Sequence, residues 1–275
     1  MTDQTNDLGK RLELAKELVG HCEQHAKDPL GVDLAPLALF RGIIEMADAV
    51  ILLAEANEGK SSFPMVPLLR SMLEYFFSLE YILAKESKNP EDHRTRSRAW
   101  LVFCINQMIA LKEVVTPSTN RGTDFKQQLV VHCGAVGQQL CRYVERLNAN
   151  DTIQQLRNRL NEPDLIALQR KYQAMEKTPS YFFTLVNDKL RSIENLALKV
   201  ERWPLYKILY TWFSPTVHGT APLEFLPKTT DDAVRFAPRR RENGLDFIGL
   251  AENILHLAGV AVAEHYGGGG TTPQA

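Results

Sequence analysis

Apolar residues recur at helical spacing along almost the whole chain, which leaves little room for any fold but an all-helical one. In the stretch 8–26, apolar residues at positions 8, 12, 15, 18, 19 and 22 line one helix face, and Pro29 and Gly31 follow as a stop signal. No segment of useful length alternates apolar and polar residues as a half-buried strand would. The periodicity predicts further helices over 33–59, 61–86, 91–115, 124–147, 152–160, 163–177, 181–202, 205–217 and 245–266.

These segments predict an all-α fold, a single helical bundle of eight to ten helices over residues 1–266. No repeat period of 30 to 45 residues is visible, which argues against a helical solenoid. The stretch 116–180 is more ambiguous, and we interpret it as an insertion or a cap on the bundle. Residues 267–275 begin with four consecutive glycines and are expected to form a flexible tail.

The charge balance narrows the classes of function. The 275 residues include 32 Lys and Arg against 33 Asp and Glu, which excludes a strongly basic, sequence-blind nucleic-acid binder but permits a small cationic cleft. The four cysteines form no C-x-x-C pair and are expected to be reduced. The first residues lack a signal peptide's basic and apolar regions, and apolar runs such as 49–54 and 99–105 are too short to span a membrane. These features predict a cytoplasmic protein.

The segment 68–83 is apolar on nearly every side, so this helix is expected to be central in the bundle. It nevertheless carries Arg70 and Glu74 at i and i+4, on one face. Charges in such a place mark either an ion pair that organises the core or a functional site. Glu80 falls on a different face and is expected to point to solvent.

A second unusual segment ends in His218 and Gly219, at the C-terminal end of a predicted helix. One interpretation is a capping histidine that interacts with the negative end of the helix dipole, with the glycine in the left-handed position. The other is an imidazole that faces a pocket and acts as a general acid or base. Ser214, four residues earlier, shares the face of His218 and is a candidate substrate-binding residue.

The combination of Arg70 and Glu74 in an early apolar helix with a late Ser214-x-x-x-His218-Gly turn resembles an uncharacterised bacterial all-helical family. That family is similar to the HEPN superfamily of helical nucleotide- and RNA-acting domains. The resemblance implies an all-α, often dimeric protein of a toxin–antitoxin or phage-defence system, acting as a metal-independent endoribonuclease. It implies that His218 is the general acid or base, that Arg70 holds the phosphate and that Glu74 orients Arg70.

Catalytic members of the superfamily carry an Arg a few residues before the His. Here the positions five to seven before His218 are Phe213, Trp212 and Thr211, so Arg70 would supply the cation from another helix. The alternative is a non-catalytic helical module for dimerisation or partner binding, in which the same residues are structural. The expected partners are RNA and either a second copy of the chain or a protein of the same system.

Further substrate-binding candidates come from basic and aromatic clusters. The run 93–98 contains Arg94 and Arg96, and Arg239 and Arg240 follow a proline in an irregular segment; both groups could contact phosphates or could form solvated faces. Tyr81 belongs to an aromatic cluster that could stack on bases or could belong to the core.

A metal site is not expected from the sequence. Two histidines at positions 21 and 25 have a metal-capable spacing, but Cys22 stands where the zinc-protease pattern needs Glu, and two potential ligands at a frayed helix end do not make a site. Neither a glycine-rich phosphate loop nor a G-x-S-x-G turn occurs. The prediction is therefore that the chain uses no metal and no cofactor.

Overall fold

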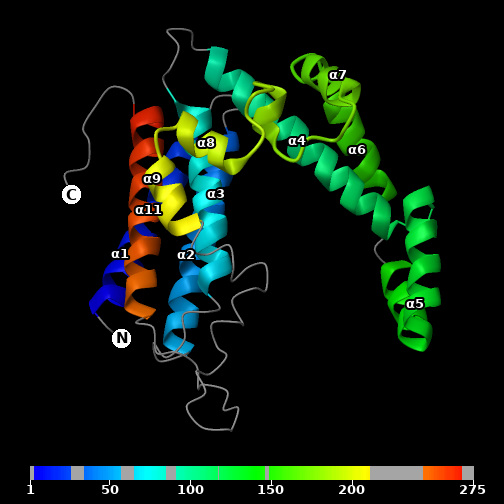
Figure 1. Cartoon of the computed structure of the whole chain (residues 1–275), viewed down its shortest axis with the longest axis horizontal. Helices are drawn as coiled ribbons and strands as arrows, with labels where there is room; N and C mark the ends of the chain where they lie inside the picture. Colours follow the sequence, from blue (N-terminus) through cyan, green and yellow to red (C-terminus); the bar gives the residue numbers. More distant parts are fainter. Residues whose placement is uncertain are drawn as a thin grey trace, which may run out of the picture. The chain divides into compact units, whose positions relative to one another are not determined.

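The computed structural model describes residues 3–25, 34–56, 65–84, 91–116, 118–145, 149–210 and 244–267. These residues form ten α-helices and two shorter helical segments with no strand, which confirms the prediction of an all-α protein of eight to ten helices. Contacts divide the chain into two compact units: unit 1 holds residues 1–94 and 192–275, and unit 2 holds residues 95–191 (Figure 1). The predicted single domain with an insertion at 116–180 stays a prediction, and the predicted tail lies outside the described residues from position 268 onward.

Unit 1 is built on four helices that pack side by side: α1 (Asp3–His25), α2 (Leu34–Ala56), α3 (Val66–Leu83) and α11 (Gly244–Tyr266) (Figure 1). Their shared core contains large, fully buried side chains, including Phe40, Phe76, Phe77 and Leu69. Burial of such side chains contributes about 1.5–3 kcal/mol each and is the main force that holds the four helices together. At the surface, Arg11 on α1 donates to Glu252 on α11 at 2.6 Å.

Helix α3 is covered on several sides, although it is not the central helix of the bundle that its sequence predicts. Helices α2 and α11 each pack against all three other helices of the bundle, whereas α3 has no extensive contact with α1. Helix α3 instead contacts α2, α11 and also α8 (Ile193–Lys199), so its apolar residues find partners on several sides. Proline is tolerated in its first turn because the first N–H groups of a helix have no intrahelical partner. The helix ends where Ala84 adopts an extended conformation, and its few exposed positions make its charged residues conspicuous.

The predicted helix over 181–202 is wrong as one continuous element. The structure instead has a 3-10 turn, η2 (Phe182–Leu185), followed by an irregular stretch and then by α8. In the irregular stretch Asn187 accepts a hydrogen bond from the backbone N–H of Lys189, and the hydroxyl of Ser192 accepts one from the N–H of Asn195. Short polar side chains that bond to nearby backbone compete with helix, and a serine at this position starts a new one.

Helix α8 ends in a left-handed residue that is not glycine. Glu201 has a φ of 59°, and the backbone N–H of Arg202 returns to the carbonyl of Ala197 at 2.7 Å. This is the hydrogen bond of a Schellman ending, in which glycine is the usual left-handed residue. The turn reverses the chain into α9 (Trp203–Leu205) and the π-helical segment η3 (Tyr206–Tyr210). Both α8 and η3 contact α3.

Unit 2 contains α4 (Glu91–Val115) from residue 95 onward, together with α6 (Asn150–Leu160), α7 (Ile166–Ala174) and η2. The amides of Asn106 on α4 and Gln169 on α7 bond to each other at 2.7 and 3.3 Å. Arg157 on α6 donates to Glu113 on α4 at 2.8 Å. Polar pairs between helices therefore supplement a smaller apolar core in this unit.

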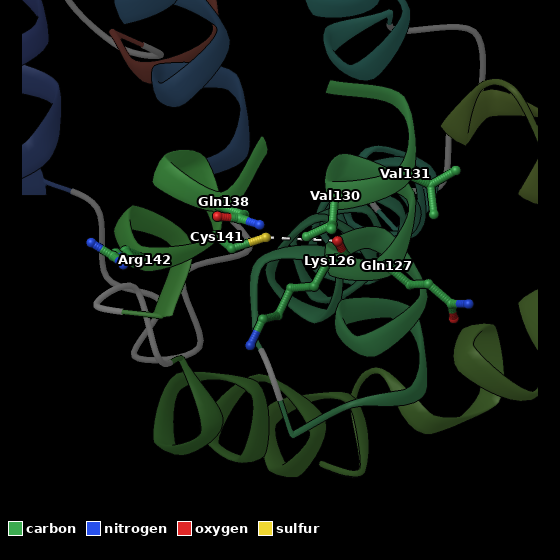
Figure 2. Close-up of a pocket in the computed structure, with 7 residues that line it drawn as sticks. All are labelled: Lys126, Gln127, Val130, Val131, Gln138, Cys141 and Arg142. Atoms are coloured by element: carbon green, nitrogen blue, oxygen red, sulfur yellow. Dashed lines mark hydrogen bonds between the residues drawn. The ribbon is translucent and has the colours of Figure 1, made fainter. Parts of the chain in front are cut away.

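The remaining helix of unit 2, α5 (Asn120–Glu145), is not the continuous helix that the sequence predicts over 124–147. Gly134 has φ 52° and ψ −126°, and the chain folds back there. After the turn, a Cβ atom at Gly137 would overlap the carbonyl oxygen of Leu129, and the Cys141 thiol lies 3.6 Å from the carbonyl of Lys126 (Figure 2). Residues eight and fifteen positions apart are this close only if the two arms run antiparallel. We call this element the α5 hairpin.

Helix α11 is long and apolar enough over Phe247–Tyr266 to pass a length and composition test for a membrane span. A second stretch passes only when α4 and α5 are counted together across a bend of 50°. In unit 1, α11 packs against α1, α2 and α3, and a third of this apolar window is buried there.

Candidate functional site

The described part of the candidate site is a cluster of three side chains in unit 1. On α3, Nε of Arg70 lies 3.3 Å from a carboxylate oxygen of Glu74, so these two predicted site residues do lie together. A terminal nitrogen of Arg70 donates to the hydroxyl of Tyr210 at 2.5 Å. The guanidinium carbon also lies 4.4 Å from the centre of the Tyr210 ring. Arg70 is thus held by an anion, a neutral hydroxyl and an aromatic face.

Burial strengthens these contacts. The Arg70 side chain keeps 14% of its surface exposed and Glu74 keeps 34%, whereas Tyr210 as a residue keeps 9%. In such a place a lost partner leaves a charge or hydroxyl that water solvates poorly, so each contact matters more than it would at the surface. Tyr206 stacks on Tyr210 with ring centres 4.7 Å apart and restricts the orientation of the phenol.

The Tyr210 phenol is held in its neutral form. Burial first, and then the nearby Glu74 carboxylate, raise the pKa of Tyr210 to about 12, although the Arg70 guanidinium acts in the opposite direction. A neutral hydroxyl can accept from Arg70 and still donate its own proton, and the Glu74 carboxylate beside it is an acceptor. The cluster therefore orients a cation with a neutral hydroxyl beside it at physiological pH.

A second Arg–Glu pair lies on the same helix. Two guanidinium nitrogens of Arg202 donate to the carboxylate of Glu80. Nε lies 3.0 Å from each carboxylate oxygen, and the terminal nitrogen Nη2 lies 2.7 Å from Oε1. The expectation that Glu80 points to solvent is wrong, because its side chain is only 15% exposed. The bidentate pair, which raises the pKa of Arg202, joins α3 to the turn after α8. It is the better example of a structural ion pair in unit 1.

Three of the other predicted substrate-binding residues lie in described parts of the chain. Tyr81 is buried in unit 1 at 3% exposure, as a core residue would be. On α4, Arg94 is exposed whereas Arg96 is buried. The positions of Ser214, His218, Arg239 and Arg240 lie outside the described residues, so their predicted roles stay predictions.

No group of three or more His, Cys, Asp or Glu side chains that could hold a metal occurs within the described ranges. All four cysteines are free thiols. Cys22 and Cys141 are buried, Cys133 is exposed, and burial raises the pKa of Cys104 to about 12. Only Cys133 therefore combines a free thiol with open access.

The sequence does not reveal that Tyr210 is the partner of Arg70 or that Arg202 is the partner of Glu80. Tyr210 and Arg202 follow their partners on α3 by 140 and 122 positions, and no spacing rule connects residues so far apart. The only local signal is the pair of tyrosines at 206 and 210, one helical turn apart, which predicts that the two rings share a face.

Comparison with known proteins gives one match. Residues 33–232 match a family of unknown function, DUF5677. This range covers almost three quarters of the chain and includes Arg70, Glu74 and Tyr210 as well as His218. No curated protein and no solved structure matches the chain at a significant level. The prediction of an uncharacterised family is thus confirmed: the chain belongs to DUF5677, a family whose function is unknown.

Proposed function

We propose that this protein is a HEPN-like, metal-independent endoribonuclease of a bacterial defence or toxin–antitoxin system. The observation that carries the proposal is Arg70, the one cation of the mostly apolar helix α3, which Glu74 and Tyr210 hold in one orientation. A preorganised guanidinium suits a phosphate, which it can bind through two parallel N–H groups. A phosphate would reach it through the exposed part of the side chain.

The second half of the proposed site follows from chain connectivity. Tyr210, which contacts Arg70, precedes His218 by eight residues, so the segment that carries the histidine begins at the cluster. In the proposed reaction His218 removes the proton from a ribose 2′-hydroxyl. The 2′-oxygen then bonds to the adjacent phosphorus, the bond from phosphorus to the 5′-oxygen breaks, and water protonates that oxygen. Arg70 stabilises the negative charge that builds up on the phosphate oxygens.

The test is cleavage of total bacterial RNA by the purified chain in the presence of a chelator. We expect cleavage to persist without divalent metal and to leave 2′,3′-cyclic phosphate ends. Arg70→Ala and His218→Ala should each abolish it. The matched control is Arg202→Ala, which breaks the other Arg–Glu pair of α3 and should leave cleavage intact. A wild-type chain that does not cut, or a control that loses cleavage equally, contradicts the proposal.

A second candidate function is a non-catalytic interaction module. The observation that favours it is the burial of the cluster: Arg70 and Tyr210 contact each other within unit 1, as members of a structural network would. On this interpretation the wild-type chain does not cleave RNA, and Arg70→Ala only lowers the stability of the chain. Thermal unfolding of the variants, measured beside cleavage, separates the two candidates.

A further inference from the structure

Helix α3 leaves one strip of its surface uncovered, and this strip begins beside Arg70. From residue 71 to residue 79 the positions that are not buried are Ser71, Glu74, Tyr75 and Ser78. Their spacing of i, i+3, i+4 and i+7 places them on one face of the helix, which we call the α3 strip. Arg70 lies at the edge of the strip, because it precedes Glu74 by one turn and pairs with that side chain.

Tyr75 brings an aromatic ring to the α3 strip. The three other aromatic residues of the helix, Phe76, Phe77 and Tyr81, are buried, whereas Tyr75 is 41% exposed. Its ring contacts Gly42 on α2 so closely that a Cβ atom at Gly42 would overlap the ring carbons Cδ2 and Cε2. A ring that packs this closely against a backbone has little freedom to rotate. Tyr75 therefore presents part of an aromatic ring to solvent in a restricted orientation.

Helix geometry brings this ring and the Arg70 guanidinium to the same level of α3. The five positions from Arg70 to Tyr75 advance about 7.5 Å along the helix axis and turn about 140° around it. A long helical side chain leans toward the N-terminus, which carries the Tyr75 ring back toward the level of Ser71. The contact of Nε with Glu74 at 3.3 Å draws the guanidinium in the opposite direction. A cation and an aromatic ring thus border one strip, with the Ser71 hydroxyl between them.

A phosphate that carries a nucleoside matches this arrangement. A guanidinium pairs with phosphate oxygens, and a serine hydroxyl can donate to another of them. A base stacks on an aromatic side chain, and a restrained tyrosine loses little freedom when it does so. We propose that Tyr75 stacks on the base next to the phosphate that Arg70 holds. This inference rests on the proposed ribonuclease function and adds a base-binding residue to its site.

The test measures binding of RNA without cleavage. The probe is a fluorescent oligonucleotide of ten 2′-O-methyl nucleotides, which has no free 2′-hydroxyl and therefore stays intact in the proposed reaction. A matched oligonucleotide has the same backbone and lacks every base. Both probes offer phosphates to Arg70, but only the first offers bases to Tyr75. Fluorescence anisotropy with the full chain should give about tenfold tighter binding of the probe that carries bases.

The decisive variant is Tyr75→Ala. It should weaken binding of the probe that carries bases about tenfold and leave the affinity for the abasic probe unchanged. Tyr75→Phe keeps the ring and should keep the preference for bases. The matched control is Tyr172→Ala, which removes a half-buried tyrosine of α7 and should change neither affinity. Loss of folding in Tyr75→Ala would weaken both probes equally, so the abasic probe separates stacking from stability.

A second variant tests the contact that restrains the ring. Gly42→Ala must displace the Tyr75 ring and should weaken binding of the probe that carries bases, again with no effect on the abasic probe. In a Tyr75→Ala background the same substitution should change neither affinity, because no ring remains to be displaced. An equal effect of Gly42→Ala in both backgrounds would contradict the assigned role of the glycine in holding the ring for stacking.

The proposal is overturned if wild type binds both probes equally or binds neither. It is also overturned if Tyr75→Ala weakens both probes by the same factor, or if Tyr172→Ala loses the preference for bases as Tyr75→Ala does. RNA cleavage, measured separately, distinguishes this failure from that of the proposed function. A chain that cuts RNA and shows no preference for bases contradicts the role of Tyr75 alone. A chain that prefers bases through Tyr75 and cuts no RNA contradicts the ribonuclease alone.

Discussion

Replacing Tyr210 by Phe removes the hydroxyl that accepts from Arg70 at 2.5 Å and keeps the ring that the guanidinium covers at 4.4 Å. A hydrogen bond to a charged group contributes about 1.5–3 kcal/mol, and Glu74 still holds the cation in the variant. We therefore expect the free energy of unfolding to fall by about 1–2 kcal/mol. Tyr210→Leu, which also removes the ring, should cost about 1–2 kcal/mol more.

The penalty should depend on pH with a definite sign. The pKa of Tyr210 is about 12 in the folded protein, against 10.0 in an unfolded chain. The stability that comes from this raised pKa is fully present below pH 10 and is lost as the pH rises toward 12, by an amount on the order of 2–3 kcal/mol. The Phe variant has no phenol at this position, so it lacks this pH-dependent contribution to stability. The difference in stability between wild type and variant should therefore shrink above pH 10 and vanish before pH 12.

Urea unfolding followed by tryptophan fluorescence is a suitable assay. In a Trp100→Phe background the remaining tryptophans, at 203 and 212, both belong to unit 1, so the signal reports on the unit that carries the cluster. An Arg70→Met background supplies the control, since the hydroxyl should contribute little there. A penalty below about 0.3 kcal/mol that is equal in both backgrounds and constant from pH 8 to 12 would refute the reasoning.

Four further perturbations test other parts of the fold. Urea unfolding tests two glycines. Gly20→Ala adds a methyl group in open space on α1 and should raise the free energy of unfolding by about 0.5–1 kcal/mol. Gly137→Ala must displace the facing arm of the α5 hairpin and should lower the free energy of unfolding by about 1–3 kcal/mol. With iodoacetamide at pH 8, mass spectrometry should find Cys133 alkylated first and Cys104 last; equal rates would contradict the assigned exposures. Arg202→Ala leaves a mostly buried carboxylate unpaired and should cost about 2–3 kcal/mol in thermal unfolding, whereas a cost near zero would mean that the pair does not form in solution.

The sequence was most informative where one local pattern has one structural solution. A helix that is apolar on nearly every side needs partners on several sides, and α3 packs against α2, α11 and α8. Its i, i+4 pair, Arg70 and Glu74, also forms as predicted, because helix geometry alone brings these side chains together. The predicted bounds 61–86 are wider than Val66–Leu83, since periodicity does not mark where the last turn ends.

The α5 hairpin shows where periodicity is insufficient. Each arm keeps its own helical pattern, so the two arms read as one helix in the sequence, and only the positive φ of Gly134 breaks it. The Arg70 cluster shows a second limit. Its third member, Tyr210, comes from a segment 140 positions later, and the choice between this tyrosine and other aromatic residues depends on tertiary packing. The sequence wrongly predicts that Glu80 points to solvent for the same reason, because its partner Arg202 lies 122 positions later.

The division of unit 1 between the two ends of the chain has a consequence for synthesis on the ribosome. Unit 2 is contiguous and can fold as soon as it emerges, but the bundle of α1, α2 and α3 must wait for α11, roughly 150 residues after residue 94. At about 5–20 residues per second, the apolar surface of α3 that α11 covers stays open for about 8 to 30 s. During that interval the nascent chain is a natural client for chaperones, and a chain truncated before Gly244 would keep that surface open permanently.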